Sequence, residues 1–502
     1  MHIHCIPALA LSLPLAACGP KLLGSLDTDS ASETTSTGET TQAPGDASTT
    51  TASSSTTGSD DTTTTTTAAP PDTTLATDTA ESTSTSGGSS CEDCPPVLQV
   101  AGSGNHTCAL VEGGRLRCWG LGQYGALGLG NTQNVGDDEL PAEVPDVDVG
   151  GEVVEVVAYG GGAATCARLA GGDVRCWGGE TNFEGLLGRQ DPAWIGDDEA
   201  PSSIAPIVIG GPVVQLTLGG SHACARLEDG AVRCWGAGTD GRLGYGNPQN
   251  IGDDEDPADA GDVDVGEPVL HIAAGGVQTC ALLAGGRVRC WGNGSNGALG
   301  YGIFDPEGPP QDAWIGDDET PASMGDVPIG GFVTQLVTGV AHTCALLDTG
   351  GVRCWGEHDF GGLGYGPAIE GEAAIGDDET PASLGDIPLD HPAIQIAAGY
   401  DRTCALLDTG ALRCWGYNVY GALGIASPLT DTKFMTPVEL PDVLVGGDVA
   451  AIALSFEQTC AILTTGALRC WGRNFWGELG YGHTQPIGDD EHPAAAGDVP
   501  YL

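Results

Sequence analysis

Hydrophobic and polar positions repeat one pattern seven times between residue 95 and the C-terminus. In the first unit, short alternating or β-branched stretches, separated by Gly or Pro, cover Val97–Ala101, His106–Val111, Arg115–Trp119 and about Val144–Val149. Alternation with a period of two between such breaks is typical of β-strands. We therefore expect four short antiparallel strands in each unit.

The second and third strands of each unit are expected to form a tight hairpin. Pairing Cys108 with Cys118 leaves residues 112–114 as a three-residue loop, and it places Leu110 opposite Leu116. The last residue of such a loop is left-handed, a conformation that Gly adopts easily. Gly holds this position in all units: Gly114, Gly172, Gly230, Gly286, Gly350, Gly410 and Gly466.

Four antiparallel strands repeated seven times predict an all-β, seven-bladed β-propeller, with residues 91–502 as one domain. A linear β-solenoid or a string of separate hairpins would also repeat strands. Partial units at both ends, Val97–Ala101 and Asp498–Leu502, can complete blades and therefore favour a closed ring.

The motif string is nearly complete in Gly339–Gly366: Gly-x-x-His-Thr-Cys-Ala-Leu, then Arg-Cys-Trp-Gly, then Gly-x-Leu-Gly. It resembles the repeat of the regulator of chromosome condensation family, which implies a propeller. The founding member is a chromatin-bound nucleotide exchanger for a small GTPase, an activity that we do not expect in a strongly acidic, secreted chain. Similar propellers serve as protein-binding platforms, including a secreted bacterial one that inhibits β-lactamases.

A Cys-x9-Cys-Trp-Gly motif marks every unit, where family repeats usually have apolar residues. In the hairpin register each pair is directly cross-strand, and the spacing, even number and apparent signal sequence favour disulfides over reduced thiols or zinc sites. Cys91 and Cys94 form a separate Cys-x-x-Cys, which we interpret as a local clip rather than a redox centre. The predicted pairs are Cys108–Cys118, Cys166–Cys176, Cys224–Cys234, Cys280–Cys290, Cys344–Cys354, Cys404–Cys414, Cys460–Cys470 and Cys91–Cys94.

The N-terminal segment is organised differently. Residues 1–17 are apolar, and Leu15-Ala16-Ala17-Cys18 resembles a bacterial lipobox, which implies a signal peptide, acylation of Cys18 and a lipid-anchored segment 18–24. A plain secretory signal is the alternative, because the first residues carry His rather than Lys or Arg. Residues 25–90 contain 37 Ser or Thr and predict a disordered tether. We expect a cell-envelope protein on the outer membrane or cell surface, bound to membrane through the lipid only.

Charge narrows the class of partner. The formal net charge is −51, from 68 acidic and 17 basic residues, and Lys occurs only at positions 21 and 433. Nucleic-acid binding depends on basic residues that neutralise phosphates, so no nucleic-acid partner is expected. We expect a monomer.

Much of the acidity lies in a loop motif, (Val/Ile)-Gly-Asp-Asp-Glu, present in every unit except the sixth, which has residues 431–433 there. Three adjacent carboxylates could bind Ca²⁺, but adjacent side chains point in different directions, so we favour a solubilising or ion-paired loop and predict no cofactor. The motifs are Gly136–Glu139, Gly196–Glu199, Gly252–Glu255, Gly316–Glu319, Gly376–Glu379 and Gly488–Glu491.

An Arg precedes the second Cys of every unit. Our hypothesis is that each Arg pairs with a carboxylate of an acidic loop and so joins neighbouring blades. The arginines are Arg117, Arg175, Arg233, Arg289, Arg353, Arg413 and Arg469.

No catalytic motif is visible, so we predict a non-enzyme. His106, His222 and His342 share one repeat position, but other units hold Ala, Gln or Arg there, which argues against a functional histidine ring. An enzyme with a site in the central funnel and a purely structural envelope protein are the alternatives.

The loop between Trp-Gly and Gly-x-Leu-Gly varies most. Its last residue is Tyr124, Glu184, Asp240, Asn296, Phe360, Tyr420 and Trp476 in blades one to seven. In a closed ring the aromatics of blades five, six, seven and one form a contiguous arc. Aromatics dominate interface hot spots, so Tyr124, Phe360, Tyr420 and Trp476 are the candidate binding site for a protein or surface glycan. The alternative is that the rings only pack on neighbouring loops.

Overall fold

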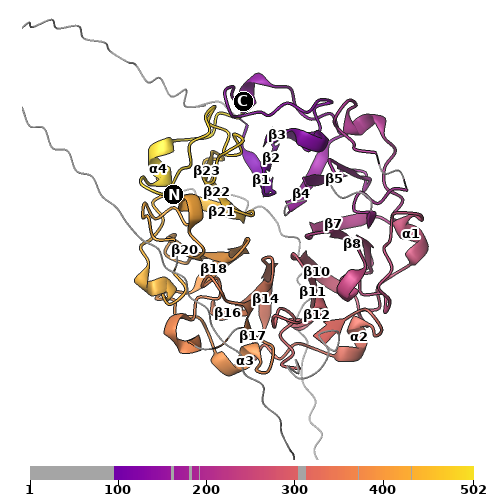
Figure 1. Cartoon of the computed structure of the whole chain (residues 1–502), viewed down its shortest axis with the longest axis vertical. Coiled ribbons are helices and arrows are strands. Elements are labelled where there is room, and N and C mark those ends of the chain that lie inside the picture. The colour runs from indigo at the N-terminus through magenta and orange to yellow at the C-terminus, as the bar shows by residue number, and fades with distance from the viewer. Residues whose placement is uncertain are drawn as a thin grey trace, which may run out of the picture. The chain divides into compact units, whose positions relative to one another are not determined.

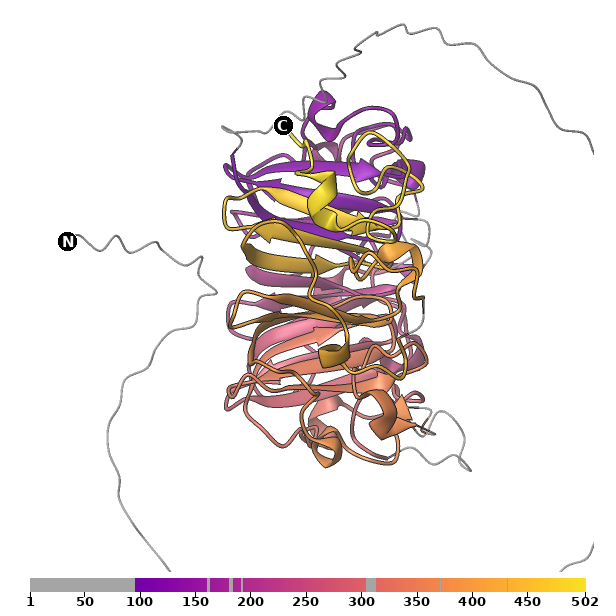
Figure 2. The same cartoon turned by 90° about the vertical axis from the view of Figure 1, so that its left-hand side faces the viewer.

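Seven small antiparallel sheets surround a common centre in the computed structural model (Figure 1). The structure describes residues 95–502, except 160–162, 180–183, 191–192, 304–312, 371, 373 and 431. The predicted signal peptide, Cys18, the tether and the Cys91–Cys94 pair lie outside the described residues. The sheets are blades of a propeller, as the sequence predicts. Figure 2 shows the ring from its edge, with the strands running between its two faces.

Each blade begins with an inner strand, followed by a middle and an outer strand. The inner strands are β1 Val97–Gly102, β4 Val153–Tyr159, β7 Val213–Leu218, β10 Val269–Ala274, β14 Val333–Thr338, β18 Ala393–Ala398 and β21 Val449–Leu454. The middle strands are β2 His106–Val111, β5 Ala164–Leu169, β8 His222–Leu227, β11 Gln278–Leu283, β15 His342–Leu347, β19 Arg402–Leu407 and β22 Gln458–Leu463. The outer strands are β3 Arg115–Gly120, β6 Val174–Trp177, β9 Val232–Gly236, β12 Arg287–Asn293, β16 Val352–Glu357, β20 Leu412–Gly416 and β23 Leu468–Gly472.

The fourth strand differs from the prediction. Among the described residues two blades have one, β13 Trp314–Ile315 and β17 Ala374–Ile375, and each is two residues long. In four other blades a single bridge takes its place, as between Gly120 and Val135. Residues 144–149 form no strand, because the chain there already leaves for the next blade. They attach to the outer strand through a hydrogen bond from Val147 N–H to the carbonyl of Leu116 (2.8 Å).

Short helical turns follow the acidic loops. Each starts with Pro, whose fixed φ suits the first helical position. The four-residue α-helices end at a Gly with φ of 75–77°, a left-handed conformation. These helices are α1 Pro257–Ala260, α2 Pro321–Met324, α3 Pro381–Leu384 and α4 Pro493–Ala496. The 3₁₀ turns Pro141–Glu143 and Pro201–Ser203 follow the other two acidic loops, and Pro437–Glu439 takes the same place in blade six. Four further 3₁₀ turns in the described part of the chain do not start with Pro and lie elsewhere: Gln123–Gly125, Thr239–Gly241, Gly366–Ile369 and Val419–Gly421.

The hairpin register is confirmed in every blade. Cys108 lies opposite Cys118 and Leu110 opposite Leu116, with Gly114 at φ +72°. All seven intra-blade disulfides are present, with Cα–Cα distances of 4.0–4.1 Å. These cysteines are buried among the apolar residues of the core, so each disulfide fastens the two strands that carry most of a blade's packing.

A repeated hydrogen-bond pattern joins each blade to the one before it. The Trp after the second Cys is fully buried, and in every blade except the fourth its indole N–H donates to the carbonyl of the second residue of the preceding blade's Gly-x-Leu-Gly segment. In blade five, Trp355 donates to Ala298 O (3.0 Å), and the Thr343 hydroxyl donates to the same oxygen (3.1 Å). The same indole bond forms at 2.9–3.1 Å for Trp119, Trp177, Trp235, Trp415 and Trp471.

The ring closes by the same pattern, with no strand shared between the first and last blades. Trp119 of blade one donates to the carbonyl of Glu478 in blade seven. Val97 N–H donates to Gly466 O (3.0 Å). The Tyr501 hydroxyl donates to Pro95 O (3.2 Å), which brings the two ends of the propeller together.

The contribution of the indole hydrogen bond to stability can be tested, because one of the seven tryptophans lacks this bond and serves as a control. Trp355→Phe keeps an aromatic ring but removes the donor to Ala298 O. Trp291 is equally buried, yet its N–H has no acceptor among the described residues. We expect Trp355→Phe to lower the free energy of unfolding by about 1 kcal/mol more than Trp291→Phe, the usual net value of a hydrogen bond, as measured by urea denaturation. Equal losses in the two variants would show that the bond adds no stability.

Candidate functional site

One face of the ring carries two sets of loops from every blade, and we call it the loop face. Because the strands are antiparallel, the turn between inner and middle strands and the loop after the outer strand lie at the same end of a blade. The hairpin loops lie at the other end. In blades five, six and seven the turns are residues 339–341, 399–401 and 455–457, and the loops are residues 357–360, 417–420 and 473–476.

The predicted aromatics lie on this face, but most of them are paired with another ring. Tyr420 and Phe475 are 4.8 Å apart between ring centroids, and Phe360 lies 4.6 Å from Tyr417. Tyr124 contacts Trp194 at 5.0 Å. In each case the second ring belongs to the next blade.

The predicted arc of aromatic residues thus consists of ring pairs, each formed between two neighbouring blades. Both sequence interpretations apply, because the rings pack on neighbouring loops and still present surface. Trp476 is 39% exposed, Tyr420 37% and Phe475 45%. Among the described residues no ring contact links Trp476 to Tyr124, so the continuous surface is on blades six and seven.

Sequence reasoning missed two rings in the turns of blades six and seven. Tyr400 lies 4.1 Å from Phe456 and 6.1 Å from Tyr417. Both occupy a position that holds Gly220 and Gly276 in blades three and four. Alignment of the seven turns would have exposed this change from Gly to an aromatic residue.

Carboxylates accompany these rings. Asp401 follows Tyr400 and Glu457 follows Phe456, while Glu357 and Asp359 come from the loop of blade five. Burial, followed by the charge of Glu357, raises the pKa of Asp401 to about 7. Glu457 pairs with Arg473 (3.1 Å) and Asp359 with Lys433 (3.4 Å). This corner of the loop face is therefore both aromatic and acidic.

The acidic loops have a structural role at the blade junctions. In the first loop a Cβ on Gly136 would lie 2.4 Å from the carbonyl oxygen of Gly477 in the preceding blade, so only Gly fits at this contact. Elsewhere Gly130 N–H donates to Gly196 O of the next blade's loop (3.0 Å). In blade six, which lacks the motif, the Thr432 hydroxyl instead contacts Gly416 N and O (3.0 and 2.7 Å).

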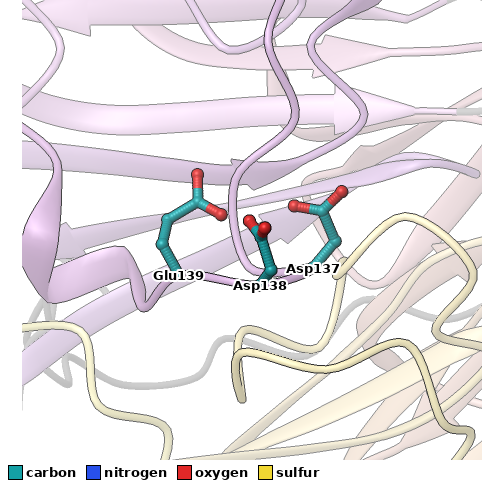
Figure 3. Close-up of side chains that lie close together, drawn as sticks. All are labelled: Asp137, Asp138 and Glu139. Atoms are coloured by element: carbon teal, nitrogen blue, oxygen red, sulfur yellow. The ribbon is translucent and has the colours of Figure 1, made fainter.

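The expectation that the three carboxylates of a loop diverge is wrong. Figure 3 shows the carboxyl groups of Asp137, Asp138 and Glu139 on the same side of the loop. One oxygen from each lies within 4.8 Å of the others, an arrangement that could hold a metal ion and that recurs in the other acidic loops. The turn after Gly136, at φ +98°, curves the backbone so that successive side chains converge. Partial burial, followed by the crowding of the neighbouring carboxyl groups, raises the pKa of Glu255, Glu319 and Glu491 to about 7.

The arginines do not pair with the acidic loops, contrary to our hypothesis. Arg233 instead contacts Asp262 (2.8 Å), in the Gly-Asp-Val segment that leaves the blade, and donates to Ile209 O (2.5 Å) in the segment that enters it. Five other arginines pair with the equivalent Asp, whereas Arg175 donates to the backbone carbonyls of Pro201 and Ser202. The acidic loops are out of reach because they pack against the preceding blade.

The histidines are structural, as the sequence indicates. His106 and His222 each contact a Thr hydroxyl of the next blade through Nε2, at 2.6 and 2.7 Å. Burial lowers the pKa of His106 to about 4 and that of His222 to about 3. In blade six Arg402 occupies the same position and donates to Phe456 O (2.7 Å). These side chains connect neighbouring blades.

Comparison with known proteins agrees with this architecture. The family model described as "Regulator of chromosome condensation (RCC1) repeat" matches residues 97–126, 213–242, 269–298, 333–361 and 393–422, and a second model of the same description matches residues 113–167. The chain is 27% identical over 398 residues to the ultraviolet-B receptor UVR8 of Arabidopsis thaliana, covering 78% of this chain and 80% of UVR8. It is 33% identical over 212 residues to mitochondrial RUG3 of the same plant, covering 41% of this chain and 44% of RUG3.

Solved structures show the same fold. Yeast RCC1 (Prp20), in a complex with Kap60, superimposes with a TM-score of 0.57 at 20% identity over 80% of this chain and 85% of that one. Human WBSCR16 gives a TM-score of 0.56 at 20% identity over 74% of this chain and 88% of its own.

The crowded carboxylates predict a pH effect. Burial and the carboxyl groups of Asp377 and Asp378 raise the pKa of Glu379 to about 8, so the folded chain keeps a proton that the unfolded chain loses near pH 4.5. Stability from this group is present at low pH and is lost as the pH rises through 8. Glu379→Gln, which is always neutral, should therefore raise the melting temperature at pH 8.5 and have little effect at pH 5.5, measured in EDTA.

Glu439→Gln is the matched control with the opposite sign. Hydrogen bonds from the backbone N–H and hydroxyl of Thr436 (2.7 and 3.0 Å) lower the pKa of Glu439, so its charge stabilises the folded state at neutral pH. Neutralising it should lower the melting temperature at pH 8.5. A change of the same sign in both variants would contradict the assignment of crowding to the acidic loop.

Proposed function

Because the chain is built from repeats of the regulator of chromosome condensation family, we propose that its propeller is a non-catalytic binding platform for a partner protein. The observation that carries the proposal is the cluster of exposed aromatics on blades six and seven: Tyr420, Phe475 and Trp476. Large rings held on a rigid scaffold lose little conformational entropy on binding and are enriched in interface hot spots. Variable loops on an invariant ring are typical of binding sites.

Related propellers support a protein partner. Prp20 is bound to Kap60 in its solved complex, and propellers of this repeat family typically bind proteins. At 20% identity, the similarity to Prp20 shows a common fold but does not indicate that this chain binds the same partner. We therefore define the partner by the surface it would contact.

The disulfides bear on where binding takes place. Seven disulfides within one chain are typical of an oxidising compartment, extracellular or periplasmic. We propose that Cys18 carries a lipid anchor and that residues 25–90 act as a tether that holds the propeller away from the membrane. Within the part of the chain that the structure describes, no helix has the length and apolar character required to cross a bilayer.

A non-catalytic role is favoured over an enzyme. The histidines at the repeated position are buried and committed to the next blade, and burial holds their pKa well below the ordinary value. The aromatic surface presents rings and carboxylates but, among the described residues on blades six and seven, no nucleophile paired with a base. Aromatic rings and carboxylates are sufficient for binding a partner protein.

The proposal is tested by capture of partners from the surface of the cells that produce the protein. Chemical cross-linking of the full chain, followed by quantitative mass spectrometry, should recover a specific protein with the unaltered chain. Tyr420→Ala combined with Trp476→Ala should reduce this recovery about tenfold or more, because hot-spot aromatics each contribute about 2 kcal/mol or more.

Phe332→Ala is the matched control. Phe332 is 49% exposed, but it lies at the hairpin end of its blade, where its carbonyl accepts from Asp348 N–H (2.9 Å). Recovery should be unchanged in this variant. Equal recovery with all three proteins would refute binding through the loop face, and recovery abolished by glycosidase treatment would identify a glycan as the ligand.

A further inference from the structure

Four aromatic rings form a continuous row across blades five, six and seven of the loop face. Their order is Phe360, Tyr417, Tyr400 and Phe456, with successive centroid distances of 4.6, 6.1 and 4.1 Å. All four side chains are half-buried, so each packs against its neighbours and still presents part of its ring. We call this set the aromatic row.

The fold itself does not require these rings. In blade three the turn position of Tyr400 is Gly220, and a Cβ there would lie 2.5 Å from the carbonyl oxygen of Gly276. The turns of blades three and four thus approach closely through glycine, whereas those of blades six and seven carry Tyr400 and Phe456. The equivalent position in blade five holds Val340, so aromatic residues at this position are a feature of blades six and seven and are not required by the turn itself.

A carboxylate without a donor lies beside the row. Glu357 accepts a hydrogen bond from the side-chain amide of Asn296 (3.3 Å), and Glu457 and Asp359 have basic partners. In contrast, the side chain of Asp401 has no hydrogen-bond donor among the described residues. Burial is the main cause that raises its pKa to about 7, because removal from water disfavours the charged form. The charge of the adjacent Arg402 lowers this pKa only in part, so a cationic ligand would give Asp401 a direct hydrogen-bond donor.

A second unpartnered group interacts electrostatically with Asp401. The hydroxyl of Tyr159, at the end of inner strand β4, is buried and has no hydrogen-bond partner among the described residues. Burial raises the pKa of this phenol, and the charge of Asp401 raises it further.

We propose that the aromatic row and Asp401 receive a basic, extended segment of the partner protein. This inference rests on the proposed binding-platform function and specifies the chemistry of the partner. A lysine or arginine side chain of the segment donates to Asp401, while neighbouring basic side chains lie on the ring faces, where cations are attracted by the π-electrons. The net charge of −51 on the chain favours the approach of a basic partner.

The shape of the site favours an extended segment over a small organic cation. The rings lie in a row over three blades and pack on one another, rather than around a cavity. A small cation would contact one or two of them, whereas a peptide can follow the whole row. Glu357 and Asp401 lie along its course without a salt bridge to any described basic residue, whereas Glu457 and Asp359 are paired with Arg473 and Lys433.

Direct binding of a defined probe tests the proposal. A fluorescein-labelled peptide of alternating glycine and arginine is titrated with the full-length chain at physiological salt, and fluorescence anisotropy is recorded. The same peptide with glutamate in place of arginine is the ligand control. We expect saturable binding of the arginine peptide only. Equal binding of both peptides, or of neither, would overturn the inference.

Variants locate the site. Tyr400→Gly with Phe456→Gly introduces the residue that blades three and four tolerate in the same turn, and it should weaken binding about tenfold, since each exposed cation–π contact is worth about 0.5–1 kcal/mol. Asp401→Asn preserves shape and should weaken binding to a similar extent. Asp254→Asn removes the same charge from an exposed acidic loop and should change affinity less than about twofold, because distant exposed charges are screened.

The outcomes separate this inference from the proposed function. Equal weakening by Asp401→Asn and Asp254→Asn would show that the peptide responds to overall charge alone, and would overturn the site. Partner capture that needs Tyr420 and Trp476 but survives the double glycine variant would overturn the inference and leave the binding platform intact. Displacement of the peptide by tetramethylammonium at concentrations where sodium has no effect would identify a small organic cation as the ligand and would likewise overturn it.

Discussion

Six of the seven buried tryptophans of this ring donate their indole N–H to a carbonyl of the preceding blade. Trp355 reaches Ala298 O, and five other tryptophans reach the equivalent carbonyl. A Thr hydroxyl on the middle strand commonly shares the same oxygen. Buried polar groups are rarely left unpaired, so a blade whose acceptor comes from its neighbour is incomplete alone. The repeated Trp-Gly and Gly-x-Leu-Gly segments are two halves of one contact, and closure of the ring gives every acceptor segment a following blade.

The parts of the fold that sequence predicted well are those fixed within a hairpin. The pairing of Cys108 with Cys118 follows from a strict spacing and a three-residue loop that ends in Gly, and both depend on a few adjacent residues. The number of blades follows from counting motifs. The fourth strand, the partner of Arg233 and the convergence of the acidic side chains depend instead on how connecting segments travel between blades, and no local pattern encodes that path.

The same distinction explains the candidate site. Tyr420 and Trp476 were identified because their loop varies within an otherwise constant repeat. Tyr400 and Phe456 were missed because their turn is short and, in most units, contains glycine, so it was treated only as a break between strands. Only the structure shows that turn and loop lie at one end of the blade, so that residues from three blades form one surface beside Asp401. One set of repeat positions therefore holds neighbouring blades together. At another set, blades five to seven carry residues that the other blades lack.

The way in which the ring closes also affects how its chain could be reconnected. Each sheet is formed by consecutive strands of a single repeat, so no blade is divided between the two ends of the chain. The ends of the propeller meet where Tyr501 contacts Pro95. New termini could thus be opened in any connector between blades, with the old ends joined, without breaking a sheet or a disulfide. The propeller is thus a closed ring of similar blades, and its fold does not depend on which blade comes first in the chain.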